Sequence, residues 1–253
     1  MNQARFGRLC MEAATKGRTA GADGFGTLSE KRLHAVIKKY ICPNEDFHEV
    51  PMEGTRYLAD IRVGDDVVEV QTGAFYPMKK KIDHYLQNTN CTVTVVHPIA
   101  SVRRLSWVDP ESFEIGNARR VAGERAEALL HELYSLLPHL GNPRLRFRLL
   151  LLEVHDFRLQ NGSRSRDRKK GSVRYERMPI ALIDELDLST PDDFRCFIPK
   201  DLPSPFTVKQ FSTLSKIRGR DAYSAVRVLA ALGLFAPTDP IGRAMAFAIV
   251  GKK

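Results

Sequence analysis

Two carboxylates on a predicted β-hairpin are the residues of this sequence best placed to do chemistry. The dipeptide Gly64-Asp65 separates two runs rich in β-branched residues, Tyr57–Val63 and Asp66–Gln71, which is the pattern of a hairpin with a two-residue loop. With that loop, Asp60 lies opposite Glu69, and because strand side chains alternate between faces, both project from the same side. Carboxylates opposed in this way have Cβ atoms about 5 Å apart.

Like charges at that distance repel each other, and a divalent cation between them would remove the repulsion. Mg²⁺ in proteins is typically held by one or two carboxylates together with waters and substrate phosphate. Such an ion polarises a phosphoryl oxygen and activates a water. We therefore expect Asp60 and Glu69 to bind Mg²⁺ or Mn²⁺. Glu49 is a third candidate ligand, because a turn at Glu53-Gly54 would place it opposite Leu58, on the same side as Asp60.

Polar side chains that follow the hairpin are candidates for orienting water and phosphate. Gln71 projects from the same face, and its amide can position a water or a phosphate oxygen, although it cannot act as a base. A helix is predicted to open at Pro77, and three consecutive lysines, 79–81, lie at its start. At least one of them could reach back to a phosphate. The alternative, from spacing alone, is that the hairpin carboxylates face solvent and are neutralised by Arg62 or Arg56.

The elements predicted around this hairpin alternate between helix and strand. An apolar stripe predicts a helix over residues 29–41, and the β-branched run 92–96 is typical of a strand covered on both faces. The predicted order is helix, three strands, helix, strand. The pattern weakens over residues 102–122, where we expect a linker. We expect the first two dozen residues to be loosely packed.

The stretch ADIRVGDDVVEVQTG, with a helix before it and a lysine-bearing helix and the strand TVTVVHPIA after it, resembles the PD-(D/E)xK nuclease superfamily. It resembles more narrowly an uncharacterised bacterial family with a D-x8-ExQ motif and a C-terminal winged-helix-like region. The resemblance is clearest over residues 28–100. It implies an α/β fold, a restriction-endonuclease-like mixed sheet flanked by helices. It also implies phosphodiester hydrolysis with one or two metal ions, and Asp60 and Glu69 as ligands.

The sequence departs from the superfamily's commonest pattern at Gln71, where a lysine usually stands. Some divergent nucleases of the superfamily have ExQ at this place. The resemblance then implies that the stabilising cation comes from another position. We expect Lys81 to supply it, with Lys79 as the second candidate.

The C-terminal region resembles a winged helix. Thr207 is placed to cap one helix, and Asp221 to cap a second that ends near Gly233. Three side chains remain on the outer side of the second helix, where a recognition helix meets DNA: Arg220, Tyr223 and Arg227. A hairpin over residues 237–247 would form the wing. Similar helix pairs also occur in proteins that bind only other proteins.

The net charge of +9 favours a polyanionic partner, because neutralising phosphates releases condensed counterions. A basic loop contributes much of this charge, and three of its residues are expected to contact nucleic acid: Arg166, Arg168 and Lys169. The alternative is a solvated loop that only aids solubility. The four cysteines are scattered without CxxC spacing, which favours reduced thiols in the cytoplasm. No Walker loop, GxGxxG or GxSxG is present, so nucleotide hydrolysis and serine-hydrolase chemistry have no support.

These patterns predict three parts: a nuclease-like core over residues 1–105, a helix and extended hairpin with the basic loop over 106–202, and the winged-helix-like region over 203–253. The expected function is metal-dependent cleavage of nucleic acid, DNA in preference to RNA. The alternatives are an inactive nuclease fold that binds nucleic acid or regulates, and a protein–protein adaptor. No membrane partner is expected, and both a monomer and a homodimer remain open.

Overall fold

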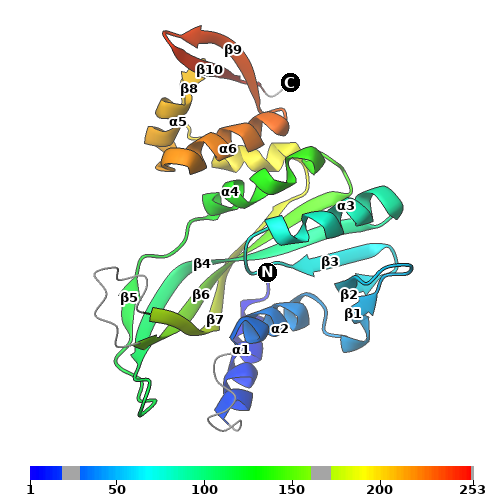
Figure 1. Ribbon diagram of the computed structural model, residues 1–253, viewed down its shortest axis with the longest axis vertical. Coiled ribbons are helices and arrows are strands. Elements are labelled where there is room, and N and C mark those ends of the chain that lie inside the picture. Colours follow the sequence, from blue (N-terminus) through cyan, green and yellow to red (C-terminus); the bar gives the residue numbers. More distant parts are fainter. Residues whose placement is uncertain (19–28, 161–171, 252–253) are drawn as a thin grey trace.

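The computed structural model describes residues 1–18, 29–160 and 172–251, and within them the chain has a mixed α/β fold (Figure 1). A seven-stranded sheet has the order β1-β2-β3-β4-β6-β7, with β5 pairing to β4. Its strands are β1 (His48–Pro51), β2 (Leu58–Val63), β3 (Asp66–Val70), β4 (Thr92–Val108), β5 (Arg119–Val121), β6 (Leu145–Gln160) and β7 (Ser172–Leu188). The sheet is flanked by helices, as predicted.

The β2–β3 hairpin has the predicted register. Val63 pairs with Asp66, and Ile61 pairs with Val68. The pairing ends there, although β2 continues alongside β1 and β3 continues alongside β4. The two strands therefore separate at Asp60, one residue beyond the last pair.

Helices cover both faces of the large sheet (Figure 1). On one face lie α1 (Gln3–Arg18) and α2 (Ser29–Ile41), which pack on Val70, Val96 and Leu150. On the other lie α3 (Lys79–Asn88) and α4 (Leu129–Leu133), which share a core with Val67, Val95 and Leu149. Neighbouring residues of one strand thus belong to different cores, as the period of two requires.

The helix predicted over residues 29–41 is confirmed, but the expectation of loose packing before it is wrong for the described residues. Residues 3–18 form α1, in which Phe6 has no exposed surface and packs edge-on against Tyr40 at 5.2 Å. Burial of an aromatic side chain stabilises this helix against α2. Residues 19–28 lie outside the described part.

The stretch predicted as a linker, residues 102–122, instead contains strands. β4 continues to Val108, and β5 pairs with it antiparallel. Gly123, just after β5, lies against the backbone of β4. A Cβ atom at this position would lie 1.9 Å from the carbonyl oxygen of Ser101. β6 and β7 then join the same sheet, with β6 parallel to β4, so the sheet extends across the boundary predicted at residue 105.

The C-terminal elements form a second layer of structure that packs on α4. They are β8 (Phe206–Thr207), α5 (Val208–Ser215), α6 (Gly219–Ala231), β9 (Phe235–Ile241) and β10 (Ala244–Ile249), with the sheet order β8-β10-β9. Thr207 caps α5 in a capping box with Gln210, as predicted for the cap. Asp221 does not cap α6, which begins two residues earlier at Gly219.

Short 3₁₀ helices connect these elements: η2 (Glu45–Phe47), η3 (Tyr76–Met78), η4 (Ala126–Ala128), η5 (Tyr134–His139) and η6 (Pro191–Phe197). One apolar core continues from Ile82 of α3 through Leu129 and Leu133 of α4 to Ala225 and Leu229 of α6. α4 therefore joins the large sheet to the C-terminal elements (Figure 1).

Cys10, Cys42, Cys91 and Cys196 are all free thiols. None of the helices in the described ranges combines the length and the apolar character needed to cross a bilayer.

The C-terminal end of α3 depends on Arg144, which donates hydrogen bonds to the carbonyl oxygens of Leu86, Thr89 (2.7 Å) and Cys91 (3.3 Å). A cation at a helix C-terminus also interacts favourably with the helix dipole. We expect Arg144→Met to lower the free energy of unfolding by about 2–3 kcal/mol. Urea denaturation measures this change. Arg146 is an exposed neighbour on β6, and Arg146→Met should change the free energy of unfolding by less than about 0.5 kcal/mol. Equal losses in both variants would contradict the capping role of Arg144.

Candidate metal centre

Asp60 lies where β2 separates from β3. Beyond the last backbone pair of the hairpin, its side chain accepts the next hydrogen bond from β3. Its Oδ2 accepts a hydrogen bond from the backbone N–H of Val70 at 2.7 Å and lies 3.1 Å from Nε2 of His34 on α2. Burial raises the pKa of Asp60, but the hydrogen bond and attraction of His34, the Val70 N–H and the charge of Lys81 outweigh it and lower the pKa. Asp60 is therefore an ionised carboxylate.

Glu69 is buried, with only 6% of its side chain exposed. Its Oε2 lies 2.5 Å from Nζ of Lys81, and its Oε1 accepts a hydrogen bond from the hydroxyl of Tyr85 at 2.9 Å. Burial raises the pKa of Glu69 to about 7, and the charge of Asp60 adds to the rise, although Lys81 and Tyr85 oppose it. The charge of Asp60 thus acts on Glu69, but the two residues lie beyond the last pair of the hairpin, and helices on opposite faces of the sheet contact them.

Lys81 and Tyr85 reach Glu69 because they are four residues apart on α3 and so share one face. Lys81 was the predicted cation, and the structure brings it to the carboxylate pair. Lys79, the second candidate, forms an ion pair with Asp83 at 3.1 Å instead. The sequence analysis missed Tyr85, although the four-residue spacing from Lys81 was the signal for it.

The amide nitrogen of Gln71 is engaged by the turn after β3, and no hydrogen bond between Gln71 and the carboxylate pair is found among the described residues. Nε2 of Gln71 donates to the carbonyl oxygen of Ala74 at 2.7 Å and closes the turn after β3. The backbone carbonyl oxygen of Gln71 accepts a hydrogen bond from Nδ1 of His97 at 2.6 Å, so Nδ1 carries the proton. The same turn is held at Phe75, whose N–H donates to Glu132 of α4 at 3.0 Å. Gln71 and His97 thus fix a rigid connection between β3 and α3.

Glu49 lies near Asp60, but not through the predicted register. Val50 pairs with Ala59, so Glu49 stands level with Asp60 and does not face Leu58. Its φ of +53° is a left-handed conformation that a glutamate rarely adopts. Lys38, 2.8 Å away, lowers the pKa of Glu49, while burial and the charge of Asp60 oppose the change.

His34 and Lys38 extend this pattern of paired charges to α2. They are four residues apart and contact Asp60 and Glu49 respectively. The sequence analysis did not single out His34, whose contact with Asp60 bridges 26 residues. Each carboxylate of the cluster is therefore held by a basic side chain from a covering helix.

The donors available for a metal ion are few. Among the described residues, no group of three or more His, Cys, Asp or Glu side chains is placed to hold one. Asp60 and Glu69 do interact, and two carboxylates completed by waters and substrate phosphate are the donor set that Mg²⁺ commonly uses. The residues thus fit a largely hydrated Mg²⁺ or Mn²⁺, and not a site closed by protein ligands alone.

The residues predicted to contact nucleic acid fall into two groups. On α6, Ala222, Ala225 and Leu229 face inward, and three side chains are exposed on the outer side as predicted: Arg220, Tyr223 and Arg227. The basic-loop residues lie outside the described part of the chain: Arg166, Arg168 and Lys169.

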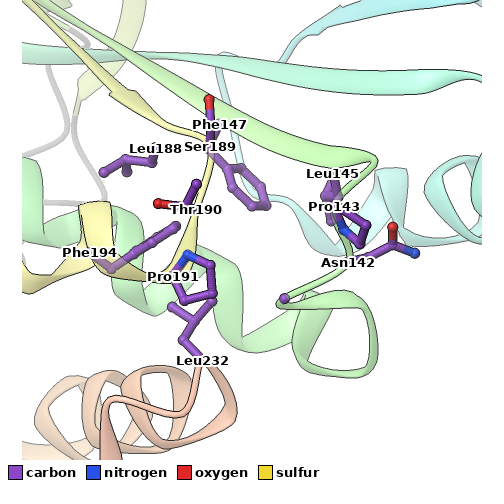
Figure 2. Close-up of a pocket in the computed structure, with 11 residues that line it drawn as sticks. Asn142, Pro143, Leu145, Phe147, Leu188, Ser189, Thr190, Pro191, Phe194 and Leu232 are labelled. Carbon is purple, nitrogen blue, oxygen red and sulfur yellow. The ribbon is translucent and has the colours of Figure 1, made fainter. Parts of the chain in front are cut away.

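Two hollows lie along the junction with the C-terminal elements. One, of about 130 Å³, is lined by Leu145, Phe147, Phe194 and Leu232 among others and has no titratable side chain (Figure 2). It offers no group for catalysis. The other, of about 230 Å³, is lined mainly by residues with charged or titratable side chains, among them Glu132, together with the turn before α6.

Comparison with known families gives one match. The model of a family described as a domain of unknown function (DUF8091) matches residues 31–189, more than half of the chain. Neither the curated proteins nor the solved structures contain a match.

The raised pKa of Glu69 predicts that folding stability falls as pH rises. The carboxyl of Glu69 has a pKa of 4.5 in the unfolded chain and about 7 in the fold. It therefore stabilises the fold fully below pH 4.5, and this contribution is lost as the pH rises through about 7. The difference corresponds to about 3 kcal/mol. We expect the protein in EDTA to lose about this much stability relative to Glu69→Gln between about pH 5 and about pH 8. Urea denaturation across this range tests it, and parallel stability curves would contradict the raised pKa.

Proposed function

This chain belongs to the DUF8091 family, and from the site itself we propose that it is a Mg²⁺- or Mn²⁺-dependent nuclease that hydrolyses phosphodiester bonds, in DNA in preference to RNA. One observation carries the proposal: Lys81 contacts Glu69 beside Asp60, at the place where two strands of the sheet separate. Two interacting carboxylates can hold a metal ion, and a lysine beside them can stabilise the charge that develops during phosphodiester hydrolysis.

Each residue would have a distinct role. Asp60, which is ionised, and Glu69 would hold the ion, and Glu49 is the remaining candidate ligand. A bound divalent ion supplies a polarised phosphoryl oxygen and an activated water. Lys81 would neutralise the charge that develops on the phosphate. Gln71 and His97 would act by keeping the connection to α3 in place.

The order of the elements supports a restriction-endonuclease-like core. A helix (α2), the antiparallel strands β1-β2-β3, a helix (α3) and the parallel strand β4 follow one another, with Asp60 on β2 and Glu69 on β3. This is the order on which the resemblance to PD-(D/E)xK nucleases rested.

The C-terminal elements support a winged-helix-like unit that binds nucleic acid. α5 and α6 are followed by the β9–β10 hairpin, and α4 with η5 packs on α6 in the place of a first helix. Arg220 and Arg227 are exposed on α6, and the net charge of the chain is +9. Such a unit would contact the phosphate backbone of a duplex.

Two observations favour an alternative function. The Gln71 amide is bound to Ala74, and both oxygens of Glu69 already accept hydrogen bonds. A nuclease fold that binds nucleic acid without cutting it would have these features.

We expect metal-dependent cleavage that requires both carboxylates. The protein is incubated with linear, circular, single-stranded and branched DNA and RNA in Mg²⁺, Mn²⁺ or EDTA. Asp60→Ala and Glu69→Ala should each reduce cleavage by roughly 10²-fold or more, because each removes a group that holds the ion. Asp66 is an exposed carboxylate on β3, the strand that carries Glu69. Asp66→Ala is therefore the matched control and should cleave normally.

The same experiment separates the alternative. No cleavage by the unmodified protein in any metal, with mobility shifts that persist in Asp60→Ala and Glu69→Ala, would reject the nuclease and leave a binding protein. Weak binding of every nucleic acid would instead favour a protein–protein adaptor.

Lys81 and the metal ion should compete for Glu69. Because Lys81 occupies Oε2 of Glu69, Lys81→Met should tighten Mn²⁺ binding about tenfold while lowering cleavage by roughly 10²-fold. Isothermal titration calorimetry, at a pH well above the pKa of Glu69, measures the affinity without any activity. Lys79→Met, on the same helix but paired with Asp83, should leave the affinity unchanged. Weaker Mn²⁺ binding in Lys81→Met would show that the lysine orients Glu69 and does not compete for it.

A further inference from the structure

An exposed tyrosine stands on the connection between the two halves of the candidate site. Tyr76 begins η3, and 76% of it is exposed, the highest value among the large apolar side chains in the described part of the chain. Its neighbours Phe75 and Met78 are buried in the main core. An exposed aromatic side chain on its own is common on protein surfaces, so the role of Tyr76 has to be inferred from its surroundings.

The backbone that carries Tyr76 is held firmly. The N–H of Met78 donates to the carbonyl of Phe75 at 3.0 Å, and the N–H of Lys79 donates to the carbonyl of Tyr76. Glu132 accepts the N–H of Phe75, and Phe75 packs edge-on against His97 at 5.1 Å. The aromatic ring is therefore presented to solvent on a preorganised turn, which reduces the entropy lost when a ligand binds.

Tyr76 is also close in the chain to the groups of the site. The rigid connection starts at Gln71, and α3, which comes directly after η3 and lies over β3, brings Lys81 to Glu69 (Figure 1). Tyr76 and Lys80 are four residues apart across the junction of η3 and α3, and Lys80 directly precedes Lys81. Both are exposed.

The charge at this junction suits a polyanion. Lys79 and Lys81 have acidic partners, Asp83 and Glu69, whereas Lys80 forms no ion pair with any residue that the structure describes. An aromatic ring beside an uncompensated lysine is the combination by which proteins hold unpaired nucleic acid, with the base on the ring and the phosphate on the cation.

We propose that Tyr76 stacks on an unpaired base next to the phosphate to be cut, while Lys80 contacts a neighbouring phosphate. This inference rests on the proposed nuclease function and specifies its substrate class. In a duplex both faces of an internal base are already stacked, so the ring selects strands whose bases are free. Together with a C-terminal unit that holds duplex, the favoured substrate is a junction between duplex and single strand, such as a frayed end or a branch.

The test measures binding without cleavage. Fluorescence anisotropy in EDTA compares a labelled single-stranded DNA with the blunt duplex of the same sequence. Since stacking of one base contributes about 1–3 kcal/mol, Tyr76→Ala should weaken single-strand binding by about 5- to 100-fold and duplex binding by less than about twofold. Tyr76→Phe and Tyr76→Trp, which keep the ring, should bind like the unmodified protein. Phe113→Ala, another exposed aromatic residue, is the control and should have no effect.

Several results would overturn the inference: unchanged single-strand binding in Tyr76→Ala, equal losses for both DNAs, no binding of single strands at all, or failure of Tyr76→Phe to retain affinity. Thermal melting confirms that each variant is folded. The outcome is separate from that of the nuclease proposal. If Tyr76→Ala selectively loses single-strand binding but the unmodified protein cleaves nothing, the stacking role stands and the enzyme is rejected. If the unmodified protein shows metal-dependent cleavage but Tyr76→Ala binds single strands normally, the enzyme stands and the stacking role is rejected.

Discussion

Repulsion between the carboxylates of Asp60 and Glu69 is the constraint around which the site is arranged. Burial raises the pKa of Glu69 and the charge of Asp60 adds to the rise, while Lys81 and Tyr85 limit it, so that the pKa is about 7. The fold thus supplies positive charge that favours the ionised carboxylates. It does so from both covering layers, because α2 provides His34 to Asp60 and α3 provides Lys81 to Glu69. Side chains from both helix layers can reach the carboxylate pair only where β2 and β3 separate, because a continuous sheet would keep the two layers apart.

The site and the C-terminal elements form one connected structure. α4 contributes Leu129 and Leu133 to the core shared with α6, and Glu132 of the same helix binds the turn after β3. The chain then returns to the large sheet through β6 and β7 before it reaches β8. A partner bound at α6 would therefore be held in a fixed position relative to the carboxylate pair, which a tail on a flexible linker could not do.

Local sequence patterns predicted the hairpin well, because Gly64-Asp65 and the alternation around it fix the register within a few residues. The same reasoning failed where distant parts of the chain decide the structure. His34 contacts Asp60 across 26 residues, and α1 is stabilised by packing on α2 and β7, so neither could be found from nearby residues. The register of β1 was wrong because the turn before β2 is longer than two residues: Pro51 pairs with Leu58, and the backbone N–H of Met52 donates to the carbonyl oxygen of Tyr57. Tyr85 was within reach of the sequence, through its spacing from Lys81.

In the proposed nuclease, Gln71 stands where PD-(D/E)xK nucleases usually have a lysine, and this changes what the site depends on. A lysine at position 71 would be placed by β3 itself, next to Glu69. Lys81 is instead placed by α3, whose position depends on Arg144 at its C-terminal end and on the contact of Asp83 with His139 of η5. η5 packs against α6, so the cation beside Glu69 is positioned partly by the elements proposed to bind nucleic acid.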